Sequence, residues 1–160
     1  MAPTRSTIQT CSLLLAAAVI TVGLTLPSAT WARERLPGPI QADVVSVRDG
    51  DTLEVRARIW LGQVISTKVR LAGVDTPELR GRCHRERRMA EAARDFVRGK
   101  LADPRVTLRD IRYGKYAGRV LARVITARGE DLGEALIAAG LGRPYRGRRR
   151  GSWCEQAQSR

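Results

Sequence analysis

The chain has 160 residues and a formal net charge of +13, and its 43% hydrophobic residues include a single phenylalanine. This length is enough for one domain with a core of small aliphatic side chains, and it excludes two large domains. The basic balance indicates attraction to polyanions such as nucleic acid or an acidic membrane surface, and says nothing about chemistry.

The first segment, residues 1–32, has the pattern of a secretory signal peptide. Arg5 precedes an apolar run from residue 13 to 26, Pro27 ends that run, and a small-residue cleavage site ends at Ala32. The run is short for a bilayer span, so retention as an anchor is the alternative. We therefore expect a secreted or periplasmic monomer with no stable membrane association after cleavage.

Three strands are predicted at the start of the remaining chain. Residues 33–42 hold two prolines and a glycine and are predicted to be a lead-in to a domain formed by residues 43–160. The strands are expected at residues 43–48, 52–59 and 64–71, with Val45 and Val47 on one face of the first. The second alternates cleanly, and its predicted core positions are Leu53, Val55, Ala57 and Ile59.

The third strand leads into the sequence Val74-Asp75-Thr76-Pro77-Glu78. Arg70, on the strand itself, falls on the face opposite the apolar residues and is expected to point away from the core. Proline fixes its own φ and restricts the residue before it, so the turn should hold Asp75 and Glu78 in fixed directions. Hard-cation binding and water activation both need such fixed carboxylates. A charged loop at a strand end is the alternative.

Two helices and two further strands follow. After a basic stretch at residues 79–88, a helix is predicted from apolar positions that end before Pro104: Met89, Ala93, Phe96, Val97 and Leu101. Strands are predicted at residues 106–112 and 119–126. Asp131 should cap a second helix, with Glu134 completing a capping box and Gly140 ending it. Its expected apolar stripe is Leu132, Ala135, Leu136 and Ala139. The basic tail, with arginines at 148–150, is predicted to be a loop.

This element order predicts an α+β, mainly β fold. Five short strands, with a helix between the third and fourth and a second helix after the fifth, favour a five-stranded Greek-key barrel of the OB type.

Removal of residues 1–32 leaves two cysteines, Cys83 and Cys154. In an oxidising compartment such an isolated pair favours one disulfide. A loop of this length gives a stabilisation of roughly 4 kcal/mol in the chain-entropy model. The alternative, a metal site of both cysteines with His84, lacks paired-ligand spacing.

Three carboxylates, those of Asp51, Asp75 and Glu78, stand at turns where strands begin or end. Carboxylates in irregular sets suit Ca²⁺, and two arginines on different strands, Arg70 and Arg119, could clamp a phosphate. The chain has one histidine, which argues against a Ser-His-Asp triad and against a histidine–metal nuclease site. These residues predict a carboxylate–metal–arginine enzyme that hydrolyses phosphodiesters.

Three motifs in this order resemble the thermonuclease (staphylococcal nuclease-like) family. They are Asp49-Gly-Asp51-Thr52, then Arg70 followed by Val74-Asp-Thr-Pro-Glu78, then Lys115-Tyr116 followed by Gly118-Arg119. The resemblance extends from about residue 43 to 145 and implies the OB barrel. One departure is Ala117, an extra residue compared with the family's Lys-Tyr-Gly-Arg segment.

The resemblance also implies a role for each site residue. Asp51 and Asp75 would be direct Ca²⁺ ligands, with the Thr76 carbonyl as a third, and Glu78 would activate or position water. Arg70 and Arg119 would bind the scissile phosphate, and the nucleotide pocket would be lined by Tyr116 and Tyr145. The implied activity is Ca²⁺-dependent hydrolysis of DNA and RNA with little sequence preference, leaving 3′-phosphate ends. The alternative is a non-catalytic OB module that binds nucleic acid through its basic face.

Overall fold

The structure is a computed structural model, and it describes residues 34–114 and 118–154. The predicted signal peptide and Tyr116 lie outside the described residues. Within the described part of the chain, no helix is long and apolar enough to cross a membrane.

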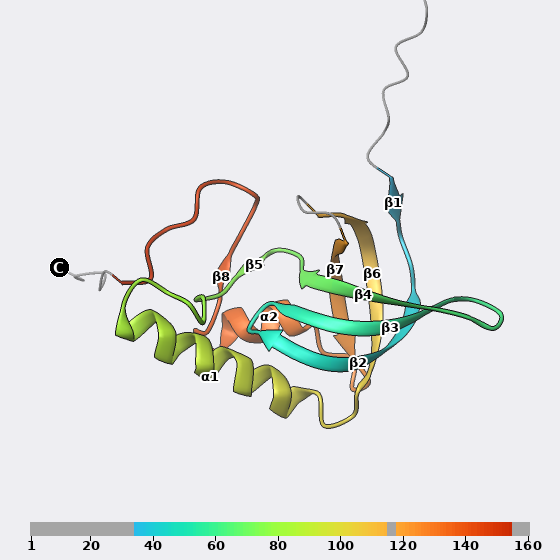
Figure 1. The fold of residues 1–160 in the computed structure, drawn as a ribbon, viewed down its shortest axis with the longest axis horizontal. Helices are drawn as coiled ribbons and strands as arrows, with labels where there is room; N and C mark the ends of the chain where they lie inside the picture. The colour runs from blue at the N-terminus through green and yellow to red at the C-terminus, as the bar shows by residue number, and fades with distance from the viewer. Residues whose placement is uncertain (1–33, 115–117, 155–160) are drawn as a thin grey trace, which may run out of the picture. The chain divides into compact units, whose positions relative to one another are not determined.

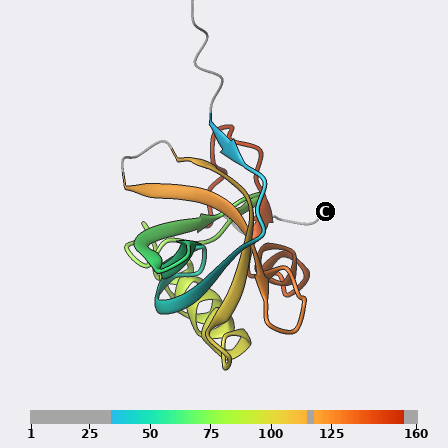
Figure 2. The same ribbon diagram turned by 90° about the vertical axis from the view of Figure 1, so that its right-hand side faces the viewer.

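Five strands form the closed barrel predicted from the sequence (Figures 1 and 2). They are β2 (Ile40–Asp49), β3 (Thr52–Trp60), β4 (Gln63–Leu71), β6 (Arg105–Tyr113) and β7 (Arg119–Thr126). The strand order around the barrel is β2-β3-β4-β7-β6, and β6 pairs with β2 to close it. All pairs are antiparallel except β4 with β7. This arrangement confirms the OB-type α+β fold.

Two helices occupy the predicted places in the chain order. Helix α1 (His84–Lys100) follows β4 and precedes β6, and α2 (Leu132–Ala138) follows β7. The Asp131 carboxylate caps α2, because it accepts hydrogen bonds from the backbone N–H groups of Gly133 (2.8 Å) and Glu134 (3.2 Å). Helix α1 packs against β2 and lies along one side of the barrel (Figure 1).

The core consists of small aliphatic side chains, as the composition predicted. Strands β3 and β4 contribute the fully buried Leu53, Val55 and Val69, α1 contributes Val97, and α2 contributes Leu136. Burying such a side chain stabilises the fold by about 1.5–3 kcal/mol. The packed barrel and helices therefore give the strand ends that carry the acidic residues a rigid support.

One predicted strand face and two predicted core positions are wrong. Val45 is 58% exposed, because Val44 pairs with Val55 and Ser46 with Glu54, which leaves Val45 as the extra residue of a β-bulge. Ile59 is 45% exposed, since it lies near the end of the β3–β4 hairpin, beyond the buried residues. Ala139 is the exposed C-cap of α2 rather than part of its buried stripe.

Two predicted boundaries also move. The lead-in is partly strand, because β1 (Arg35–Leu36) pairs with β6 and β2 begins at Ile40. Helix α1 begins at His84, so that residue is helical and exposed rather than in a loop. The reason for the early start is the N-cap, where the Cys83 sulfur accepts the backbone N–H of Glu86 at 3.5 Å.

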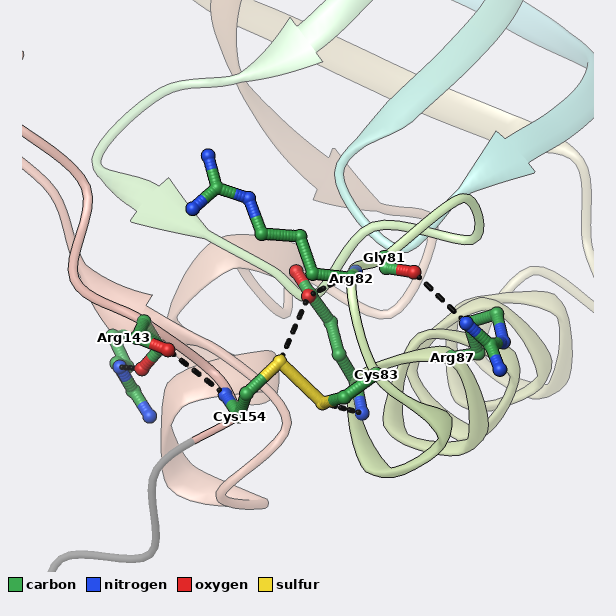
Figure 3. The surroundings of a disulfide bond; sticks show 8 residues. Gly81, Arg82, Cys83, Arg87, Arg143 and Cys154 are labelled. Atoms are coloured by element: carbon green, nitrogen blue, oxygen red, sulfur yellow. Dashed lines mark hydrogen bonds between the residues drawn. A yellow bond between two sulfur atoms is a disulfide. The ribbon is translucent and has the colours of Figure 1, made fainter.

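Cys83 and Cys154 form the predicted disulfide, with their Cα atoms 5.9 Å apart and a sequence separation of 71 positions. The bond fixes residues 145–154, which we call the C-terminal segment, to the start of α1 (Figure 3). The Glu86 carboxylate lies 3.6 Å from the Cys154 sulfur. Because both sulfurs are consumed in the bond, the alternative metal site of these cysteines with His84 is not formed.

We expect non-reducing mass spectrometry of the protein, purified under oxidising conditions, to show the peptides of Cys83 and Cys154 linked. Replacing Cys154 by serine should lower the free energy of unfolding by about 2–4 kcal/mol, because the unfolded chain loses its cross-link. Denaturant unfolding with and without reductant measures this difference. Two free thiols in the protein purified in this way would contradict the pairing.

Candidate active site

The loop that carries Asp75 is held by a small second sheet. Strand β5 (Val74–Asp75) pairs antiparallel with β8 (Arg143–Pro144), so that Asp75 lies opposite Arg143. The backbone N–H of Tyr145 then donates to the Gly73 carbonyl at 2.8 Å. The start of the tail, predicted to be a loop, is therefore a strand that fixes the acidic turn.

Asp51 comes close to this turn because Gly50 has no side chain. A Cβ atom on Gly50 would lie 2.8 Å from the Cβ of Ala93 and 3.1 Å from the Cβ of Thr76. The Asp51 carbonyl also accepts the backbone N–H of Leu71 at 2.8 Å. These contacts join the start of β3 to the end of β4 and the turn beyond it.

Asp51 and Asp75 share one arginine. Arg70 Nη1 lies 2.6 Å from the Asp51 carboxylate, and Arg70 Nη2 lies 3.5 Å from Asp75 Oδ1. The three side chains are 3–8% exposed, and Thr52 Oγ1 donates to Asp51 Oδ1 at 3.0 Å. Arg70 was expected to point away from the core, and it is nevertheless buried. The two carboxylates and the chain around them cover it.

Burial also changes the acidity of the cluster. It raises the pKa of Asp51 to about 7, against the opposing effect of the Arg70 charge and with a smaller contribution from the nearby Asp49. A carboxylate in this position is poorly solvated and gains from a nearby cation. The site therefore favours positive charge beside Asp51.

Glu78 has a different environment from the two aspartates. Its side chain is 48% exposed, and it accepts a hydrogen bond from Arg150 Nη1. The same guanidinium contacts Asp75, with Arg150 Nε 2.9 Å from Asp75 Oδ1. Within residues 34–114 and 118–154, Glu78 does not join the two aspartates in a three-carboxylate cluster. Its carboxylate is thus more accessible to solvent than those of the two aspartates.

A cavity of about 640 Å³ opens beside these residues. On one side it is lined by the acidic turn and the start of α1, through Asp75, Thr76, Glu78, Arg82 and Glu86. On the other side it is lined by the C-terminal segment, through Arg149, Arg150, Gly151, Ser152 and Trp153. The tail therefore forms a wall of the candidate site.

Sequence reasoning missed two residues of this wall, Arg150 and Trp153. Trp153 is buried, and its Nε1 donates to Asp75 Oδ2 at 3.3 Å. The predicted disulfide was the available signal, because Cys154 follows Trp153 directly and Cys83 lies just beyond Glu78.

Two further predicted residues, Arg119 and Tyr145, are among the described residues. Arg119 begins β7 and is in register with Lys68 of β4, the strand that carries Arg70. Tyr145 is the first residue of the C-terminal segment and is half-buried, and its hydroxyl donates to the Arg148 carbonyl at 2.8 Å.

A family model described as staphylococcal nuclease homologue matches residues 68–159, more than half of the chain. The chain belongs to this family. The match includes Arg70, the acidic turn and β7, and it begins after Asp51. The place of Asp51 in the site therefore rests on its contact with Arg70. No match was found among curated proteins.

Membership in the staphylococcal nuclease family assigns the domain to nuclease-type chemistry on nucleic acids. The residues present also fit the calcium ion that is typical of this family. The carboxylates of Asp51 and Asp75 are buried side by side on Arg70, with the buried Thr76 next along the chain. Such an all-oxygen donor set is one that hard cations prefer.

Proposed function

We propose that this protein is a secreted or periplasmic Ca²⁺-dependent nuclease that acts on DNA and RNA with little sequence preference. One observation carries the proposal: Asp51 from the β2–β3 turn and Asp75 from β5 are buried on a single arginine, at the edge of an open cavity. The proposed metal ligands, Asp51 and Asp75, thus contact the proposed phosphate-binding group, Arg70. The signal-peptide pattern and the disulfide support the assignment to an oxidising compartment.

Asp51, Asp75 and the Thr76 carbonyl would hold the ion. When bound, Ca²⁺ would polarise the phosphate and lower the pKa of a nearby water. Arg70 already contacts both aspartates, so its guanidinium lies within reach of any phosphate that approaches them.

The chain's own residues account for the remaining chemistry. Glu78 accepts the proton of the attacking water as the water oxygen bonds to phosphorus. The bond from phosphorus to the 5′ oxygen breaks and that oxygen takes up a proton from solvent, which leaves a 3′-phosphate and a free 5′ hydroxyl. Arg70 and Arg119 donate to the phosphate oxygens, on which negative charge develops, and Tyr116 and Tyr145 flank the nucleotide.

A non-catalytic OB module that binds nucleic acid is the second candidate, favoured by the net charge of +13. It has no need of two buried carboxylates. These carboxylates repel a polyanion, although Arg70 offsets part of the cost of burying them.

Gel-based activity assays on DNA and RNA separate the two candidates. The secreted protein is incubated with Ca²⁺, Mg²⁺ or chelator, beside the variant Asp51→Ala/Asp75→Ala. We expect both polymers to be degraded with Ca²⁺ and to stay intact with chelator or with the variant. Substrate that is retarded in a gel but never shortened, even with Ca²⁺, would favour the binding module.

Calcium affinity should rise with pH. The Asp51 proton, held with a pKa of about 7, must leave before the cation binds. Below that pKa the affinity should therefore fall by up to about tenfold per pH unit. Titration calorimetry at pH 6, 7 and 8 measures this trend. In Asp51→Asn the binding should be weaker and should lose most of its pH dependence. Equal affinity of the wild type at pH 6 and 8 would contradict the prediction.

A further inference from the structure

The C-terminal segment is fixed against the acidic turn by three separate contacts. The Cys154 sulfur is bonded to Cys83, and the buried Trp153 donates to Asp75. The Arg143 guanidinium lies over the Trp153 ring, 3.6 Å from its centroid, and donates to the Ser152 carbonyl at 2.9 Å. Figure 3 shows Arg143 beside Cys154 at this junction. The path of the segment past the site is thus set by covalent and buried contacts.

These contacts bring Arg150 to the centre of the site. Its side chain is 39% exposed and contacts both Asp75 and Glu78, and it lines the cavity with Arg82 and Arg149. Burial lowers the pKa of Arg150, but the hydrogen bond to Glu78 and the charge of Asp75 outweigh this effect and raise it above its usual value. Arg150 is therefore a permanent cation between a proposed metal ligand and the proposed base.

We propose that Arg150 is a further phosphate-binding residue of the nuclease, brought to the site by the disulfide-bonded C-terminal segment. The inference rests on the proposed function. A water deprotonated by Glu78 must reach a phosphorus atom held near Asp75, so a residue that contacts both carboxylates lies next to the reacting phosphate. A guanidinium presents five N–H donors in a planar fork that matches phosphate oxygens. Substrate binding then moves Arg150 from the carboxylates to the phosphate.

In the opposite role, Arg150 would act as a latch that blocks the site until it is displaced. Arg150 contacts Asp75 Oδ1, and a bound cation would compete with it for that carboxylate. Removing Arg150 should therefore tighten calcium binding in either role. The two roles differ in the rate of hydrolysis at saturating Ca²⁺, which falls if Arg150 binds phosphate and stays the same or rises if Arg150 only blocks the site.

The test uses Arg150→Gln, with Arg146→Gln as the matched control and Arg150→Lys as the conservative variant. Arg146 is an exposed arginine of the same segment, and it does not line the cavity. Calcium affinity is measured by calorimetry without substrate, kcat/KM on duplex DNA is measured at saturating Ca²⁺, and thermal melting checks the fold.

We expect Arg150→Gln to bind Ca²⁺ several-fold more tightly and to lose about 10- to 100-fold in kcat/KM, as for one charge-assisted hydrogen bond. Arg146→Gln should match the wild type, and Arg150→Lys should lie between.

The outcomes separate this inference from the proposed function. If the wild-type protein does not hydrolyse DNA, the proposed nuclease function is itself wrong. A wild type that hydrolyses DNA, with Arg150→Gln equal to Arg146→Gln, would overturn the role of Arg150 alone. A faster Arg150→Gln would also overturn it, in favour of the latch. If Arg150→Gln does not fold, the charge-preserving Arg150→Lys is used to test the inference. Wild-type kcat/KM in Arg150→Lys would contradict recognition of phosphate by the planar guanidinium.

Discussion

Replacing Glu78 by glutamine is expected to lower kcat for DNA hydrolysis by about 10²–10⁴-fold, the usual contribution of a general base. Glu78 is the acidic group of the site with an exposed side chain, whereas Asp51 and Asp75 are buried on Arg70. The chain's one histidine, His84, is exposed on α1 and contacts Arg88, so it is not our candidate for the general base. Single-turnover rates at saturating Ca²⁺ measure the chemical step directly.

Calcium binding shows whether this loss is chemical or structural. Glu78→Gln should keep most of its calcium affinity, while Asp51→Ala and Asp75→Ala should each lose far more, because only the aspartates are proposed to bind the ion. Calorimetric titration of the three variants provides the comparison. If Glu78→Gln loses calcium as severely as the aspartate variants, Glu78 is a ligand and its assignment as the base is wrong.

Replacing Arg119 by alanine should lower kcat by about 10²–10³-fold, which is the cost of removing one donor that acts on charge in the transition state. The stability of the fold should change little, because its backbone pairing in β7 does not depend on the side chain. Single-turnover hydrolysis and thermal melting of the variant measure the two effects.

Arg112→Ala is the matched control for Arg119, since it removes an exposed arginine from the neighbouring strand β6. It should keep the wild-type rate. Arg123, a second neighbour on β7, is held by Asp131 at 2.9 Å and by Glu134 at 3.5 Å. A large loss in Arg112→Ala, with none in Arg119→Ala, would transfer the phosphate-binding role to Arg112.

The barrel could be predicted from the sequence because its signals are local. Leu53, Val55 and Ala57 alternate with charged residues, and the turn at residues 49–51 joins two such strands. A local pattern does not show where a ladder gains a residue, so the bulge at Val45 was missed. It also does not show where a hairpin leaves the core, as at Ile59.

Arg70 shows a second limit of local patterns. Strand alternation predicts that Arg70 lies on the face opposite Val69, but alternation does not show what covers that face, and Arg70 is buried. The carboxylates of Asp51 and Asp75 come from other parts of the chain and bury it. Motif order led to both aspartates, whereas their joint contact with one guanidinium required the folded chain.

The role of the tail was the hardest part to predict. Arg150 belongs to a run of three arginines, a pattern that usually indicates a solvated surface. Its contacts with Asp75 and Glu78 depend on the disulfide, which joins residues 71 positions apart. The cysteine pair predicted that the tail returns to α1, but not which side chain would face the acidic turn.

The most direct test of a calcium-dependent nuclease site at Asp51, Asp75 and Glu78 is the rate of DNA hydrolysis across a calcium titration, measured beside calorimetric binding. We predict no hydrolysis in chelator, activity that rises with the same midpoint as calcium binding, and neither binding nor activity in Asp75→Ala. Hydrolysis that persists in chelator, or that is undiminished in Asp75→Ala, would contradict the account.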